Sequence, residues 1–212
     1  MSYCILSDRP DNAIHLQYYA QTRGIRFDDI IICGGNQTYD TLHLYAEKNS
    51  FDVHYVPEPN KASPKIEHIQ PEILAIITSS ILKKQIINLP TVGTVNSHGA
   101  VLPKYRGYGS SHWAILYDDD IGASAHIVDQ GVDTGPILAT RLLNPSEFAS
   151  IEEIIAGIYY QCKYQAMVDA IQKLSDENAE PSIQTKRGGK QYFEMHPRIL
   201  EITRRVFAMK HT

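Results

Sequence analysis

Short apolar segments alternate with longer amphipathic segments along the first half of the chain. Segments that have the length and β-branched content of buried strands are YCILS from Tyr3, IRFDDIIIC ending at Cys33, FDVHYVP from Phe51, ILAIITSS from Ile73 and TVGTVNSH from Thr91. Helix-like stretches lie between them, around residues 11–22, 38–49 and 81–88. Strands that alternate with helices are typical of βαβ units. We therefore expect an α/β fold with a doubly wound, mostly parallel, Rossmann-like sheet.

The second half of the chain follows a different pattern. A helix-like segment, GSSHWAILYDD, precedes two apolar runs in GASAHIVDQGVDTGPILATRLLN, which Gly131, Gly135 and Pro136 interrupt, so we expect a pair of connected strands there. Ser150 and Glu153 have the spacing of a capping box, and a long helix is expected from about residue 150 to 174. The polar stretch SDENAEPS follows. We predict a main domain over residues 1–175 and a C-terminal loop and helix, an appendage, over residues 176–212.

Composition and charge limit the kinds of partner. The chain is 43% hydrophobic and 21% charged, as in ordinary soluble proteins, and no apolar run reaches the roughly 18 to 20 residues that cross a bilayer. A net charge of -4 provides no basic field for nucleic acid. The start lacks a secretory pattern, and the three widely spaced cysteines are interpreted as free packed thiols in a reducing compartment. We expect a cytoplasmic protein whose partners include neither membrane nor nucleic acid.

A polar pair closes the last strand-like run. Asn96 and His98 are two residues apart, so their side chains project to the same side of an extended strand. An amide and an imidazole are the donors that hold a carbonyl oxygen as it becomes an oxyanion. In open α/β sheets ligands gather at the carboxyl ends of strands, where His98 falls. Asp133, in the loop between the later strands, is the candidate carboxylate that orients the imidazole and accepts a proton.

Four motifs in order resemble one enzyme family. NSHGAVLPKYRG, HWAI, GASAH and DQGVDTGPI look like the formyltransferases that use 10-formyltetrahydrofolate, most strongly from about Ile73 to Leu138. The resemblance implies the formyltransferase fold, with 10-formyltetrahydrofolate as co-substrate. It also implies that Asn96, His98 and Asp133 are the catalytic residues. A substrate amine would attack the formyl carbonyl, Asn96 and protonated His98 would hold the oxyanion, and Asp133 would assist proton transfer.

The resemblance further implies which residues bind the two substrates. The folate ring is expected in a slot made largely of main-chain groups, formed by Ser79, Ser80, Ile81, Leu82, Val128, Asp129, Gln130 and Gly131. The amine substrate is expected beside Pro103, Lys104, Tyr105, Arg106, Gly107, Trp113 and Tyr192. Tyr108 could stack on a base or sugar as well, and Lys186, Arg187 and Lys190 either neutralise a diphosphate or form a solvated basic loop.

Several amines are acceptors in the family. Glycinamide ribonucleotide enzymes hold a phosphate on glycines after the first strand, whereas this chain has LSDRPDNA there, with Asp8 and Pro10 in place of glycines. Initiator tRNA needs a basic C-terminal domain, for which too few residues follow Ser175, and the hydrolases carry a preceding domain. We therefore expect a small-molecule substrate, a nucleotide-linked amino sugar. Glycinamide ribonucleotide transfer and a folate- or nucleotide-binding protein without catalysis remain alternatives, and the chain could form a homodimer.

His126 and a run of three aspartates are two further polar features of the chain. His126 fits a core histidine and a residue at the active-site border equally well. The run Asp118, Asp119 and Asp120 is interpreted as a solvated turn, and no histidine and cysteine pattern supports zinc. We expect no metal.

Overall fold

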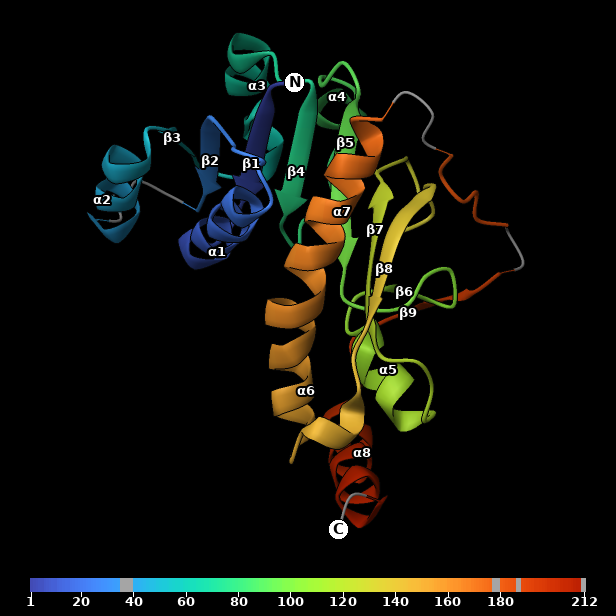
Figure 1. The fold of residues 1–212 in the computed structure, drawn as a ribbon. Coiled ribbons are helices and arrows are strands. Elements are labelled where there is room, and N and C mark those ends of the chain that lie inside the picture. The colour runs from blue at the N-terminus through green and yellow to red at the C-terminus, as the bar shows by residue number, and fades with distance from the viewer. Residues whose placement is uncertain (35–39, 177–179, 186–187, 211–212) are drawn as a thin grey trace. The chain divides into compact units, whose positions relative to one another are not determined.

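The computed structural model describes residues 1–34, 40–176, 180–185 and 188–210. By its contacts the chain forms two compact units, one of Met1–Asn96 with Ile171–Ala179 and one of Ser97–Ala170 with Glu180–Thr212 (Figure 1). Each unit is described by itself. The predicted division into a main domain over residues 1–175 and an appendage over residues 176–212 stays a prediction.

Parallel strands form the centre of the first unit. They lie in the order β3-β2-β1-β4-β5, and each is hydrogen-bonded to its neighbour in parallel register. The elements in chain order are β1 (Tyr3–Ser7), α1 (Pro10–Thr22), β2 (Asp29–Cys33), α2 (Asp40–Asn49), β3 (Asp52–Val56), a 3₁₀ turn (Pro59–Lys61), α3 (Ser63–Ile69), β4 (Ile73–Ile77), α4 (Lys84–Ile87) and β5 (Gly93–His98).

The strand order reverses between β1 and β4. From β1 the chain adds β2 and β3 on one side, then returns to place β4 and β5 on the other, which is the doubly wound arrangement that the sequence predicted. Both central strands are covered on two faces, since every residue of Ile73–Ala75 and of Cys4–Leu6 is fully buried. Helix α3 begins at a Ser-Pro pair and lies between β3 and β4. The sequence did not predict this helix.

A strand hairpin and several helices make up the second unit. The elements in chain order are β6 (Tyr105–Gly107), α5 (Ser110–Leu116), β7 (Gly122–Ile127), β8 (Ile137–Leu142), a 3₁₀ turn (Pro145–Glu147), α6 (Ile151–Gly157), a π-helical turn (Ile158–Lys163), α7 (Tyr164–Leu174), β9 (Lys190–Tyr192) and α8 (Pro197–Lys210). Strands β7 and β8 pair in antiparallel register, which confirms the predicted strand pair (Figure 1).

The long helix expected over residues 150–174 is present as a continuous helical run, although its middle is π-helical, which the sequence did not predict. Its start is as predicted, because the Ser150 hydroxyl accepts a hydrogen bond from the Glu153 amide at 3.2 Å. A π-helical turn (Ile158–Lys163) then separates α6 from α7. The backbone carbonyl of Lys163 accepts a hydrogen bond from the buried Ser97 hydroxyl at 2.8 Å. Such turns are inserted residues that side-chain periodicity does not reveal.

The C-terminal segment is part of the second unit. Strand β9 pairs in parallel with β6, and α8 contacts α5, so that Phe207 of α8 joins the hydrophobic core around Ile154. Glycines allow the close approach of the two strands: a Cβ at Gly107 would overlap the carbonyl oxygen of Tyr192, and one at Gly189 would overlap that of Pro103. In the described part of the chain no helix is long and apolar enough to cross a membrane.

Candidate active site

Strand β5 carries the predicted polar pair at its carboxyl end. Asn96 and His98 are two residues apart on this strand, and both are partly exposed while Ser97 between them is buried. The alternation of a strand therefore directs both side chains to the same side. The boundary between the two compact units falls between Asn96 and Ser97. His98 and the groups that contact it all belong to the second unit.

The loop between β7 and β8 carries Asp133. The amide of Ile127 bonds to the carbonyl of Pro136 at 2.9 Å and closes the base of this loop. Within it, the carboxylate of Asp129 accepts hydrogen bonds from the Gly131 amide at 3.0 Å and the Thr134 hydroxyl at 2.6 Å. Asp133 itself has a φ of +51°, in the left-handed region that few non-glycine residues adopt. Such strain is commonly retained at functional sites.

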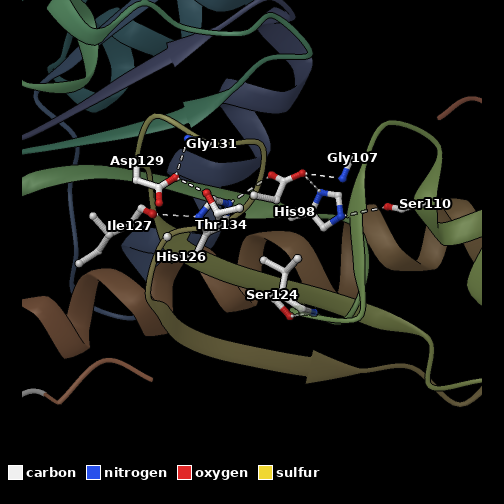
Figure 2. A network of polar contacts seen from close by, with 12 residues as sticks. His98, Gly107, Ser110, Ser124, His126, Ile127, Asp129, Gly131 and Thr134 are labelled. Atoms are coloured by element: carbon white, nitrogen blue, oxygen red, sulfur yellow. Dashed lines mark hydrogen bonds and ion pairs between the residues drawn. The ribbon is translucent and has the colours of Figure 1, made fainter. Parts of the chain in front are cut away.

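Asp133 lies between two histidines. Its carboxylate is 3.4 Å from Nδ1 of His98 and 3.3 Å from Nε2 of His126, and it accepts a 2.9 Å hydrogen bond from the Gly107 amide. Figure 2 shows His98 with Gly107 and Ser110 on one side of this network, and His126 with the Asp129 turn on the other. The predicted convergence of Asp133 on His98 is therefore present in the second unit.

The remaining nitrogen of each histidine contacts a main-chain carbonyl. Nε2 of His98 lies 2.7 Å from the carbonyl oxygen of Tyr105 and 2.9 Å from the Ser110 hydroxyl, and Nδ1 of His126 lies 2.9 Å from the carbonyl oxygen of Ile127. A carbonyl oxygen can only accept, so these nitrogens carry the proton. In His98, Nδ1, which faces Asp133, is therefore the nitrogen that gains or loses a proton.

The pKa values of His98 and Asp133 are both lowered, for different reasons. Burial lowers the pKa of His98, and the charges of His126 and Lys163 act in the same direction, while Asp133 and the Tyr105 carbonyl oppose them. Burial alone would raise the pKa of Asp133. The hydrogen bond from His126, the charge of His98 and the Gly107 amide outweigh burial and hold that pKa well below its usual range. Asp133 is thus a permanent negative charge against a mostly buried imidazole.

The predicted folate-binding residues come from both units. In the first unit, Ser79 follows β4 and donates its amide and hydroxyl to the carboxylate of Asp8, at 3.1 and 3.3 Å. Asp8 follows β1, so this contact joins the carboxyl ends of β1 and β4 at the point where the strand order reverses. Asn60 braces the same loop, since its side chain bonds to the carbonyl of Ile81 and the amide of Lys83.

The predicted substrate-binding residues surround the β6 and β9 pair of the second unit. Tyr105 is only 2% exposed, its ring stacks on Tyr192 with centroids 5.2 Å apart, and its hydroxyl donates to Asp119 at 2.9 Å. Trp113 packs against Tyr192 and donates its indole N–H to the Phe193 carbonyl. Arg106 donates to the carbonyl of Gly189. These side chains are held by one another before any ligand binds.

A groove of about 380 Å³ opens beside this aromatic group, and we call it the β6–β9 groove. Its lining residues are Lys104, Tyr105, Tyr117, Asp119, Gly188, Gly189, Lys190 and Tyr192. Lys104 forms an ion pair with Asp119, whereas Tyr117 is 56% exposed at the rim. Lys186 and Arg187, which the sequence suggested as partners for a diphosphate, lie outside the described residues.

Some contacts of this site were not predicted. Ser110 at the start of α5 contacts His98, and Gln184 from the C-terminal segment contacts the loop of Asp133. His126, for which two interpretations were open, is 2% exposed and faces Asp133. The described residues contain no group of three histidine, cysteine or acidic side chains that could hold a metal ion. Cys4, Cys33 and Cys162 are free and buried, as predicted.

Sequence comparison places this geometry in a family. The model of the family described as formyl transferase matches residues 35–171, which is more than half of the chain. The chain belongs to the formyl transferase family. The methionyl-tRNA formyltransferase of Thermodesulfovibrio yellowstonii is 34% identical over 92 residues. These residues make up 42% of the present chain and 30% of the methionyl-tRNA formyltransferase. The chain thus matches less than a third of that relative's length.

Solved structures share the fold at low sequence identity. Glycinamide ribonucleotide transformylase 1 from Symbiobacterium toebii matches with a TM-score of 0.69 and 15% identity, over 87% of this chain and 94% of its own. A sugar N-formyltransferase from Shewanella sp. matches with a TM-score of 0.66 and 15% identity, over 98% of this chain and 87% of its own. The formyltransferase PseJ from Anoxybacillus kamchatkensis matches with a TM-score of 0.58 and 19% identity, over 77% of this chain and 85% of its own. That structure contains a UDP-linked formamido sugar and tetrahydrofolate. The predicted formyltransferase fold is confirmed.

Proposed function

We propose that this family member transfers a formyl group from 10-formyltetrahydrofolate to the amine of a nucleotide-linked amino sugar. The observation that carries the proposal is the position of Asp133, whose carboxylate contacts both His98 and the Gly107 amide within a buried network. Formyl transfer needs donors for an oxyanion and a group that manages the proton of the attacking amine. A strand end with an amide and an imidazole, next to a permanent carboxylate, provides both.

The reaction proceeds by addition and elimination in this proposal. The amine lone pair attacks the formyl carbon, and the carbonyl oxygen becomes an oxyanion that the Asn96 amide and the positive charge of protonated His98 stabilise. The negative charge of Asp133 favours the protonated form of His98. The carboxylate of Asp133 accepts the ammonium proton only transiently, directly or through water, and passes it on. The carbon–nitrogen bond to the folate then breaks, and the proton passes to the departing tetrahydrofolate nitrogen.

We infer that Ser79–Leu82 in the first unit and Val128–Gly131 in the second are each folate-binding segments. Both are loops that follow strands, and in each an aspartate is occupied in holding the loop: Asp8 for the first and Asp129 for the second. Main-chain groups of a braced loop can recognise the edge of a pteridine ring without specialised side chains. Ile81, which is 79% exposed, is available to cover an apolar ring.

The acceptor is placed along the β6–β9 groove. Tyr117 and Tyr192 present ring surface there, and Lys190 supplies a cation in addition to the Lys104–Asp119 ion pair, which suits a base or sugar linked to a diphosphate. Glycinamide ribonucleotide fits the described residues less well. A phosphate would have to bind after β1, where Asp8 places a carboxylate that Thr78 and Ser79 already bond.

A panel of acceptors tests this proposal. The purified chain is incubated with 10-formyltetrahydrofolate and either nucleotide-linked amino sugars, glycinamide ribonucleotide or no amine, and both tetrahydrofolate release and the mass of the formamide are measured. Formylation of an amino sugar supports the proposal. Preference for glycinamide ribonucleotide, tetrahydrofolate release without an amine, or folate binding without turnover would each replace it, by the purine enzyme, a hydrolase or a binding protein respectively.

A further inference from the structure

Gln184 bonds to the backbone of the loop that carries Asp133. Its side-chain amide donates to the carbonyl oxygen of Asp133 at 3.1 Å and to that of Gly135 at 2.6 Å. Gln184 lies in the C-terminal segment, beyond the residues that the family model matches. The segment is itself anchored, because Ser182 and Ile137 exchange both backbone hydrogen bonds at 2.8 Å. The glutamine therefore reaches the loop from a fixed point on β8.

The orientation of this amide follows from its partners. Both partners are carbonyl oxygens, so only the nitrogen of Gln184 can face them. Its oxygen is buried and has no hydrogen-bond partner among the described residues. A buried polar atom without a partner costs about 1–3 kcal/mol, so an apolar side chain at this position would avoid a cost that glutamine carries. The two donated bonds are thus the structural reason for a glutamine here.

The loop needs such support at the residues that Gln184 contacts. Asp133 has a φ of +51°, and Gly135 lies so close to β7 that a Cβ would overlap the Ile127 carbonyl oxygen. A left-handed non-glycine residue costs of order 1–3 kcal/mol and persists only where its surroundings fix it. The two histidines lie 3.3 and 3.4 Å from the carboxylate, whereas the shorter of the two Gln184 bonds to the loop backbone is 2.6 Å.

We propose that Gln184 is a positioning residue for Asp133, whose loop backbone it fixes so that the carboxylate stays between His98 and His126. The inference rests on the proposed role of Asp133 in formyl transfer. Without the two donated bonds the loop can relax its left-handed residue, and the carboxylate moves relative to both imidazoles. A misplacement of about 1 Å far from the reacting atoms can lower a rate about a hundredfold.

The test compares Gln184→Met, which keeps the length of the side chain and removes both donors, with the wild-type chain. Gln184→Met should lower kcat by about 10- to 100-fold while KM for both substrates stays near the wild-type value, because ground-state binding is untouched. Ile183→Ala in the same segment is the control, since Ile183 is 81% exposed and should leave kcat unchanged. If Gln184→Met does not fold, Gln184→Ala, which removes both donors and adds neither charge nor bulk, is used in the same comparison.

A pH measurement separates positioning from general damage. The groups that face His98 are Asp133, His126 and Lys163, and of these only Asp133 favours the protonated imidazole. When the carboxylate is less well placed, the midpoint of the His98 titration, followed by NMR, should move to lower pH in Gln184→Met. Wild-type kcat, or a lower kcat with an unmoved His98 midpoint, would overturn the inference. The NMR midpoint needs no turnover, so an inactive wild-type chain would reject the proposed function and still leave the positioning role testable.

Discussion

The main-chain carbonyl of Tyr105 lies 2.7 Å from Nε2 of His98, and the side chain of the same residue forms a wall of the β6–β9 groove. The tyrosine ring is fixed on both sides, by stacking on Tyr192 and by the hydrogen bond of its hydroxyl to Asp119. Burial and Asp119 together raise the pKa of that hydroxyl, so it remains a donor at neutral pH. Strand β6 therefore orients the candidate catalytic imidazole and shapes the proposed acceptor site at once.

Gly107 at the end of β6 offers a direct test of this arrangement. Gly107→Ala places a Cβ against the Tyr192 carbonyl at a φ of +90°, so β9 must shift and the Gly107 amide must move from Asp133. We expect a loss of about 1–3 kcal/mol in the free energy of unfolding, measured with urea, together with a strong loss of formyl transfer.

Gly24→Ala is the matched control for that substitution. Gly24 has a φ of +76°, yet nothing lies within 4 Å of the position that its Cβ would take. Gly24→Ala should add backbone strain that lowers the free energy of unfolding by about 1–2 kcal/mol, and it should keep full activity. Equal activity of the two variants would show that close approach of β6 and β9 does not matter for the site.

Asp8 is predicted to act on folate binding and not on the chemical step. Asp8→Ala removes the acceptor that holds Thr78 and Ser79, so the Ser79–Leu82 loop loses its brace. Hydrogen bonds to charged groups contribute about 1.5–3 kcal/mol, and we expect the Kd for tetrahydrofolate to rise by about tenfold or more in a calorimetric titration. Asp28→Ala, which removes a half-exposed partner of Arg26, should leave this Kd unchanged. A rise of equal size in both variants would argue against the brace.

The lowered pKa of His98 makes the stability of the fold depend on pH. The unfolded chain binds a proton on this histidine at a higher pH than the folded chain does, so acidification through the histidine range favours unfolding. Urea unfolding at intervals from about pH 7 to pH 5 should show the wild type losing stability with acid more steeply than His98→Gln. Asp133 stays ionised across this window, because its contribution is lost only at lower pH. Identical slopes would contradict the shift.

The sequence was sufficient for the sheet and for the expectation that Asp133 lies near His98. Each strand expected in the first half of the chain is present, because fully buried parallel strands such as Ile73–Ile77 appear as unbroken apolar runs. Asp133 could be expected near His98 because both lie at the carboxyl ends of predicted strands. Helix α3 is short and polar, so its periodicity was too weak to recognise.

Other features could not be read from local patterns. The π-helical turn at Ile158–Lys163 leaves the apolar periodicity on either side intact. Ser110 and Gln184 are ordinary polar residues whose roles come from tertiary contacts with His98 and the Asp133 loop. The pairing of β9 with β6 joins strands that are short and distant in sequence, and only the glycines at 107 and 189 hint at it.

The most direct test of the account is the rate of formamide formation in Asp133→Asn, measured with saturating 10-formyltetrahydrofolate and the best acceptor of the panel. Asparagine keeps the shape of the side chain and removes the charge that lies between His98 and His126. Asp120→Asn, an exposed substitution, is the control. The account predicts that Asp133→Asn lowers the rate by about a hundredfold to ten-thousandfold, with tetrahydrofolate still bound and Asp120→Asn fully active. A wild-type rate in Asp133→Asn would contradict it.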